Sequence, residues 1–253
     1  MKNLLDHGYL KLIETWGSDK RIVEAARMST GKGFKGWGGR CPDCQGHGST
    51  IGSASCATCK GEDKIIGDEK LLKFLWDNKH ATPFEMAGAI FEVQAPIFVF
   101  REWHRHRTQS YNEMSARYMP LPDVNYIPSS ERLHLASKTN KQAGTIKDAN
   151  ELTSDNATEF IYQLAKIYGD AEALYQWALK AGVPKELARV HLPVGRYSRM
   201  RASANLRNWL AFLTLREAPA AQYEIRQYAH ALAEVIKEHF PRTYALYAEG
   251  SKS

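Results

Sequence analysis

Residues 101–117 read REWHRHRTQSYNEMSAR, and the rest of the chain is organised around this stretch. It contains six basic side chains, Arg101, Arg105, Arg107, Arg117, His104 and His106. Guanidinium groups this close repel one another unless an anion neutralises them, and the arginine fork bonds phosphate in a bidentate way. A solvated basic helix face is the alternative. The apolar run at 95–100, APIFVF, leads directly into the stretch and should anchor its first half in a core, which favours an anion-binding site.

Length and composition are those of an ordinary globular protein. The 253 residues can bury a sizeable core, with 25% charged and 43% hydrophobic residues. A formal charge of +6 favours phosphorylated or polyanionic ligands, without choosing between a nucleotide and a nucleic acid. No apolar run approaches the roughly 20 residues that span a bilayer. The N-terminal segment, interrupted by Asp6, His7 and Lys11, is a poor signal peptide, so we expect a soluble cytoplasmic protein.

Hydrophobic periodicity predicts a mixed α and β protein. Strands are predicted at 9–16, 89–94 and 197–204, and helices at 20–28, 69–78, 156–181, 185–189, from 205 to about 217, and 222–239. Pro96 should lie in the first turn of the helix that delivers residues 101–117. Residues 120–156 are polar and predict a long connection. The stripe of Ile161, Leu164, Tyr168, Ala171, Tyr175 and Ala178 predicts a core or subunit-interface face.

Within the opening stretch, Arg105-His106-Arg107, followed by seven residues and Ser115, resembles the signature of the flavin-dependent thymidylate synthases. The string RHRTQSYNEMSARY is similar to that family over its whole length. Further similarity lies in HATPFE at 80–85, GVPKELAR at 182–189 and NLR at 205–207. The resemblance implies an α+β fold with a central, mainly antiparallel sheet and long helices. It also implies a homotetramer with active sites between subunits.

The family's functional positions can be carried over residue by residue. The resemblance places Ser29, His80, Thr82, Arg105, His106, Arg107, Glu113, Asn205 and Arg207 on FAD. It places Glu102, Arg105, Glu113, Ser115, Ala116, Arg117, Arg189 and Arg216 on dUMP, with Arg117 and Arg189 at the phosphate. For Ser29 and His80 the alternative is a local role at a helix end. At position 211 the family commonly has Asn or His, and at position 220 it commonly has His. This chain has Ala211 and Ala220 instead.

The implied reaction transfers the carbon of methylenetetrahydrofolate to C5 of dUMP, forming dTMP, with NADPH as the reductant of FAD. A uracil ring becomes nucleophilic at C5 when negative charge builds on its N3–O4 edge. An arginine aimed at that edge stabilises the charge without having to titrate, and we assign this role to Arg216. Arg216 capping its helix, paired with Glu217 or Glu224, is the alternative. The string GKGFKG at 31–36 has G-x-G-x-x-G spacing but follows a predicted helix rather than a strand, so it is no Rossmann fingerprint and the flavin would not be held in that manner.

Residues 31–66 interrupt this similarity and form a glycine-rich insert in what we otherwise expect to be one domain over 1–253. Cys41-x-x-Cys44 and Cys56-x-x-Cys59, eleven residues apart, predict a tetrahedral structural zinc site. The string CPDCQGHG resembles repeats of the cysteine-rich region of J-domain chaperones, which also implies zinc. Disulfides, or His47 in place of one cysteine, are alternatives. If all four thiols bind metal, the chain has no cysteine left to attack a pyrimidine.

Two other functions stay open. The same fold and ligands could yield 5-hydroxymethyl-dUMP, and Ala211 and Ala220 are the features that favour this outcome. Net charge, the cysteine pairs and the Arg/His cluster also fit a basic zinc-dependent nucleic-acid-binding protein. Because the family match runs through the whole chain outside the insert, we expect dUMP rather than nucleic acid as the partner.

Overall fold

The computed structural model describes residues 1–250 apart from 42, 46, 49–54, 57–58, 62–63, 66, 136–144 and 146–150. Parts of the predicted insert at 31–66 and of the predicted connection at 120–156 therefore lie outside the described residues. Within the described part, no helix has the length and apolar character needed to cross a membrane. The chain divides into two compact units. The first unit comprises 1–14, 90–204 and 211–233, and the second comprises 15–89, 205–210 and 234–253.

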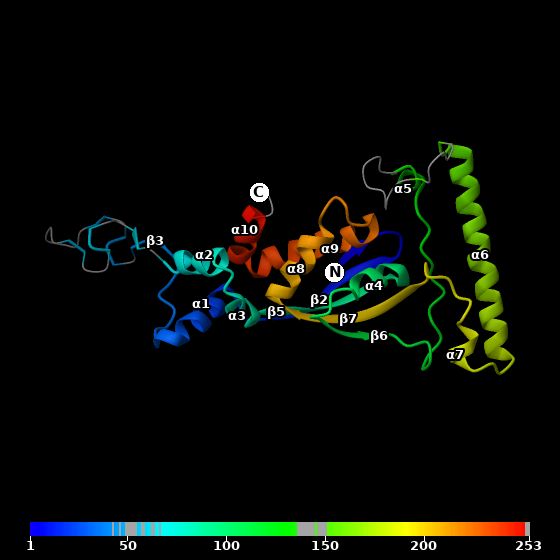
Figure 1. Ribbon diagram of the computed structural model, residues 1–253, viewed down its shortest axis with the longest axis horizontal. Coiled ribbons are helices and arrows are strands. Elements are labelled where there is room, and N and C mark those ends of the chain that lie inside the picture. The colour runs from blue at the N-terminus through cyan, green and yellow to red at the C-terminus, as the bar shows by residue number, and fades with distance from the viewer. Residues whose placement is uncertain are drawn as a thin grey trace. The chain divides into compact units, whose positions relative to one another are not determined.

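A five-stranded, mainly antiparallel sheet forms the frame of the first unit (Figure 1). Its order is β1 (Lys2–Leu4), β2 (Gly8–Trp16), β5 (Gly88–Pro96), β7 (Tyr197–Asn205) and β6 (Ser110–Glu113). The predicted strands are confirmed as β2, β5 and β7. The short β1, which pairs with β2 in register Asn3↔Tyr9, and the polar β6, which pairs with β7 in register Asn112↔Arg201, were not predicted. The α+β fold class is confirmed.

The two faces of β7 differ as its alternating sequence predicts. Met200 and Ala202 are buried, whereas Arg199 and Arg201 are exposed. Within this unit, the last residue of helix α4 (Ile97–Trp103) packs against two other helices. The Trp103 ring lies 4.6 Å from Phe212 of α8 (Leu206–Arg216) and 6.3 Å from Tyr228 of α9 (Tyr223–His239), measured between ring centroids. The predicted anchoring of residues 95–100 in a core is confirmed, because Val99 and Phe100 are buried.

The 27-residue helix α6 (Ser154–Lys180) presents the predicted stripe to its own unit. Tyr175 and Ala178 are buried, and they pack with Ala188 of the short helix α7 (Lys185–Ala188). Pro96 precedes α4 as its N-cap residue, one position before the predicted place. The predicted connection at 120–156 contains a short helix, α5 (Ser130–Leu133), and the bridge Asn125↔Arg196, so its described part is attached to the core.

Short helices dominate the second unit. They are α1 (Asp19–Arg27), the 3-10 turn η1 (Met28–Thr30), α2 (Glu69–Asp77), α3 (Ala81–Glu85) and α10 (Pro241–Gly250), with the two-residue strands β3 (Gly39–Arg40) and β4 (Lys64–Ile65). Ser18 caps α1 by accepting a hydrogen bond from the Arg21 amide. Asp19, the other predicted cap residue, is buried instead and accepts two bonds from Thr243 of α10. Helices α3 and α10 were not predicted.

Candidate active site

The signature stretch forms a helix end, a turn and a strand. Helix α4 ends at Trp103, and β6 begins at Ser110. The Tyr111 hydroxyl donates to the backbone carbonyls of Trp103 at 3.2 Å and His106 at 2.8 Å, and the Trp103 indole donates to Gln109. The turn is therefore held from both sides, so the stretch is not a single helix with one basic face. Arg101, Arg105 and Arg107 stay exposed around it.

Arg216, at the end of α8, lies against this turn. Its Nε donates to His106 Nε2 at 2.9 Å, and its Nη2 donates to the Glu102 carbonyl at 2.9 Å. Its Nη1 donates to the Glu102 carboxylate. The Arg216 side chain is only 16% exposed. The alternative partner Glu224 instead accepts bonds from Arg132, so Arg216 is ordered by the signature stretch rather than by Glu224. The guanidinium is thus preorganised, as a donor aimed at developing negative charge has to be.

His106 is held neutral by its surroundings. Burial, followed by the charge of Arg216, lowers the pKa of His106 to about 4. A neutral imidazole has one donor and one acceptor nitrogen. Because Arg216 Nε donates to Nε2, the ring proton must lie on Nδ1. The ring also packs on Phe212 with centroids 4.8 Å apart, which fixes its orientation.

The residues predicted for the nucleotide phosphate lie in neighbouring parts of the first unit. Ser115 Oγ accepts a hydrogen bond from the Arg117 amide at 3.3 Å, and Arg117 pairs with Glu186 of α7 at 3.6 Å. Lys185 Nζ donates to the Tyr118 carbonyl at 3.0 Å, so the turn after β6 lies against α7. Arg189 follows directly as the C-cap residue of α7. Ala116 is buried, and Glu113 is exposed on β6.

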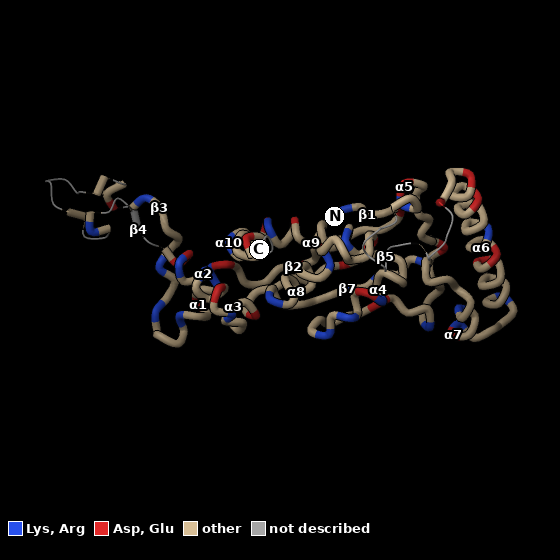
Figure 2. Tube along the Cα trace, turned by 45° about the horizontal axis from the view of Figure 1, so that its top comes forward, with Lys and Arg blue, Asp and Glu red and all other residues tan. Residues whose placement is uncertain are grey.

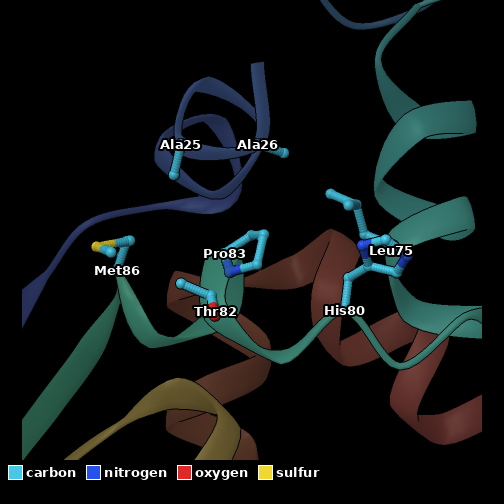
Figure 3. A pocket seen from close by; sticks show the side chains of 7 residues that line it. All are labelled: Ala25, Ala26, Leu75, His80, Thr82, Pro83 and Met86. Atoms are coloured by element: carbon cyan, nitrogen blue, oxygen red, sulfur yellow. The ribbon is translucent and has the colours of Figure 1, made fainter. Parts of the chain in front are cut away.

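The second unit contains a pocket of about 250 Å³. Figure 3 shows the lining side chains, which are Ala25, Ala26, Leu75, His80, Thr82, Pro83 and Met86. Two predicted residues thus meet at one cavity, His80 as the N-cap residue of α3 and Thr82 within that helix. Ser29 is exposed in the turn after α1, and its hydroxyl donates to the Ala26 carbonyl at 3.0 Å. That bond is the local role given as the alternative for Ser29.

Comparison with known proteins places this geometry in a family. Residues 11–242 match the family described as thymidylate synthase complementing protein. The chain belongs to this family. It is 37% identical over 248 residues to the flavin-dependent thymidylate synthase of Thermus thermophilus, with 97% of this chain and 77% of the relative covered. The corresponding protein of Wolbachia pipientis is 35% identical over 246 residues, with 97% and 75% covered.

The fold is also that of a solved relative. The crystal structure of the UMP/dUMP methylase PolB from Streptomyces cacaoi, bound with 5-Br UMP, is similar with a TM-score of 0.75 and 27% sequence identity. The similarity covers 99% of this chain and 98% of that one. The predicted resemblance to the flavin-dependent thymidylate synthases is therefore confirmed at the level of the family and the fold.

Two more residues of the predicted family set have local partners in the second unit. The Asn205 side chain accepts a hydrogen bond from the Asn208 amide at 2.9 Å and so caps α8. The exposed Arg207 pairs with Glu85 Oε1 at 2.7 Å. Glu85 was not singled out from the sequence, although it ends the quoted HATPFE segment. Tyr111 was missed as well, because no sequence pattern shows that its hydroxyl supports the signature turn.

The two positions at which this chain departs from the family pattern, Ala211 and Ala220, are exposed. Ala211 lies on α8, five residues before Arg216, and Ala220 lies between α8 and α9. A methyl group at either position offers no side-chain hydrogen bond, where the family's Asn or His would offer one.

The four cysteines of the insert converge. Their sulfur atoms all lie within 4.8 Å of one another, and all four side chains are buried. Cys41 and Cys56 have sulfurs 3.7 Å apart, and Cys44 and Cys59 have sulfurs 3.6 Å apart. These separations exceed the roughly 2.05 Å of a disulfide, so the disulfide alternative is not what the structure shows. His47, the other alternative ligand, is exposed.

Proposed function

We propose that the chain is a flavin-dependent thymidylate synthase, which transfers a one-carbon unit from methylenetetrahydrofolate to C5 of dUMP and forms dTMP. The observation that carries this proposal is the preorganised Arg216, bonded to Glu102 and His106 of the signature stretch in a chain that belongs to this family. The solved relative PolB supports the same substrate class, since it is a UMP/dUMP methylase.

Arg216 carries the activation of the pyrimidine in this proposal. Three of its five N–H groups bond Glu102 and His106, which leaves two for a ligand. A guanidinium in a partly dry site stabilises negative charge on the N3–O4 edge of uracil, and it needs no reorganisation to do so. Glu102 orients the guanidinium from one side and remains available to base or sugar donors through its other carboxylate oxygen.

The nucleotide phosphate is held by Arg117 and Arg189, with the Ser115 hydroxyl and the backbone at Ala116. The packing of α7 against the 115–119 turn supports this assignment, because it keeps the two elements that carry these arginines together. Glu186 pairs with Arg117 and would compete with a phosphate for it. That pair is exposed on both sides and is therefore weak, so a phosphate can displace it.

The residues predicted for FAD fit a flavin cofactor in part. His80 and Thr82 supply polar groups in a pocket with apolar walls, as cofactor sites commonly do, and Arg207 lies in the same unit. In the other unit, Arg105 and Arg107 are exposed and available to phosphates, His106 bonds Arg216, and Glu113 is exposed. Bound FAD would supply the redox chemistry that no side chain can supply, with NADPH as the reductant. This chain's own residues bind and orient it.

The chain is proposed to act as a homotetramer with sites between subunits. The support is the surface of α6, where Phe160, Tyr162, Ile167, Leu174 and Trp177 are about half exposed or more. Acidic and basic residues are interspersed with uncharged ones along this helix (Figure 2). Covering these large apolar side chains against a second copy would remove them from water.

The insert at 31–66 is proposed to hold a structural zinc ion within one catalytic domain. A tetrahedral ion bonded to four thiolates at about 2.3 Å needs sulfurs about 3.8 Å apart, and the Cys44–Cys59 and Cys41–Cys56 separations are 3.6 and 3.7 Å. Four protein ligands leave no open position for chemistry, so the ion stabilises the insert. Free thiols that bind metal suit a reducing compartment, which supports the cytoplasm as the location.

The absorption spectrum of the purified protein tests the proposed function. A yellow protein with flavin bands, together with about one zinc ion per chain by elemental analysis, is the expected result. A colourless protein that binds DNA with a steep salt dependence would instead support the nucleic-acid-binding alternative.

A further inference from the structure

In the hydrogen bond between Arg216 and His106, the arginine is the donor and the histidine is the acceptor. The signature alone does not explain this arrangement. An arginine side chain can rotate about its last bonds, and this rotation changes where its outer N–H groups point. Glu102 accepts from the two terminal nitrogens of Arg216, whereas His106 accepts from Nε. With all three nitrogens bonded, the plane of the guanidinium is fixed.

We infer that His106 is a positioning residue for Arg216, and that its unprotonated Nε2 holds the guanidinium in the plane that serves the pyrimidine. This inference rests on the proposed function. It gives His106 a role separate from the flavin contact that the family resemblance implies. His106 acts as a hydrogen-bond acceptor here, so its ring must be neutral and must carry its proton on Nδ1.

The surroundings of His106 fit this role. The ring packs on Phe212, one turn before Arg216 on α8. The acceptor His106 is therefore held by the same helix that carries the donor Arg216. The His106 carbonyl accepts the Tyr111 hydroxyl from β6 at 2.8 Å, which fixes the backbone behind the ring. The charged groups at the cluster are Arg216 from α8 and Glu102 from α4. A protonated ring would set a donor against the Nε–H of Arg216 and a second positive charge beside it.

Two substitutions separate the acceptor from the ring. His106→Gln keeps a neutral acceptor near the position of Nε2 and loses the ring, whereas His106→Phe keeps the ring packing on Phe212 and loses the acceptor. Each is made in the wild-type and the Arg216→Lys backgrounds, and all proteins are loaded with FAD. The rate of single-turnover dTMP formation is measured after the flavin has been reduced with NADPH and mixed with dUMP and methylenetetrahydrofolate.

The Phe variant is expected to lose on the order of ten- to hundredfold in this rate, as for a hydrogen bond to a charged group, and the Gln variant less than about fivefold. In the Arg216→Lys background, Phe should cost less than about threefold further, because residues that act as a unit are non-additive. Equal losses for Gln and Phe, or a Phe effect of the same size in both backgrounds, would overturn the role. An inactive wild-type protein would overturn the proposed function as well.

A second measurement applies to the FAD-loaded protein even if the Phe variant does not fold. Nitrogen-15 NMR of the imidazoles, with the His106 signals assigned by their loss in His106→Gln, reports which ring nitrogen carries the proton. The expected result at pH 7 is an unprotonated Nε2 and a protonated Nδ1. A proton on Nε2, or a charged ring, would refute the inference.

Discussion

Arg216 and Glu102 contact each other twice, once through the Glu102 carboxylate and once through its backbone carbonyl, where the Nη2 to oxygen distance is 2.9 Å. The second contact involves main chain, so it survives any substitution of the Glu102 side chain. The position of Arg216 is therefore tied to the backbone at the end of α4, in the signature stretch. Lysine has a compact ammonium group in place of the planar fork of arginine, so it cannot make the same set of contacts in one plane.

Arg216→Lys should bind dUMP within a modest factor of wild type and lose about 10²–10³ in turnover, because the missing interaction is strongest when charge develops on the pyrimidine. Flavin reduction by NADPH should change less. Stopped-flow oxidation of the reduced flavin by dUMP and methylenetetrahydrofolate measures the affected step. A near wild-type rate would show that Arg216 serves only to cap α8.

Arg189→Ala should raise KM for dUMP about ten- to hundredfold and leave the flavin spectrum unchanged, because a charge-assisted phosphate contact contributes roughly 1.5–3 kcal/mol. Steady-state kinetics and flavin titration provide the two readouts. Lys237→Ala, which removes an exposed positive charge from α9, is the matched control and should change neither. Equal weakening of FAD and dUMP binding would show that the phosphate assignment is wrong.

Cys56→Ser should release the metal ion while the protein keeps most of its flavin, because the cysteine cluster and the pocket at His80 and Thr82 share no residue. Zinc content and flavin absorbance are compared on the same sample. Gln45→Ala, an exposed change in the same segment, should keep both. A folded variant without metal that has also lost its flavin would show that the insert helps to build the cofactor site.

Acid should destabilise the ligand-free protein through His106. Its pKa is about 4 in the folded protein and near the ordinary value of 6.5 when unfolded. Between these values the unfolded chain binds a proton that the folded chain does not, so the free energy of unfolding falls as the pH drops from about 6.5. Urea unfolding at pH 7 and pH 5 should show a smaller loss for His106→Gln than for wild type. Equal losses would contradict the lowered pKa.

Glu224→Gln should lower the free energy of unfolding by roughly 1.5–3 kcal/mol, because this buried carboxylate accepts bonds from Arg132, Tyr126 and Gln222. Burial alone would raise the pKa of Glu224, but its hydrogen bonds outweigh burial and lower it. Its stabilising contribution is therefore present above the unfolded pKa and lost as the pH falls through the folded one. Glu238→Gln, at an exposed position of α9, is the control for urea unfolding at pH 7. A Glu224→Gln variant as stable as the control would contradict the assignment.

The long periodic segments could be predicted from the sequence because one side of each is buried. The alternation in β7 and the stripe on α6 both survive in the structure. Strand β6 has no alternation to read, since only Tyr111 of its four residues is even partly buried. Helix α3 is five residues long and contains Pro83, so its sequence shows no helical period. Asp19 was expected at a helix cap, and its partner Thr243 lies 224 positions away.

The candidate site was predicted only as a set of residues. The sequence pointed to Arg216, Glu102 and His106 separately, through the family resemblance. Their mutual bonds join positions 110 and 114 residues apart, and such contacts depend on how α8 packs against α4. The cysteine cluster is the opposite case. Its two C-x-x-C pairs bring their ligands together by local spacing, so the cluster could be predicted without knowledge of the fold.

The mass of the nucleotide product tests the account most directly. Purified, FAD-loaded protein is incubated with dUMP, methylenetetrahydrofolate and NADPH, and the nucleotide is analysed by mass spectrometry, with omission of each substrate as a control. We predict the mass of dTMP, formed only when all three are present. The mass of 5-hydroxymethyl-dUMP, or unchanged dUMP, would contradict the assignment of the chain as a thymidylate synthase.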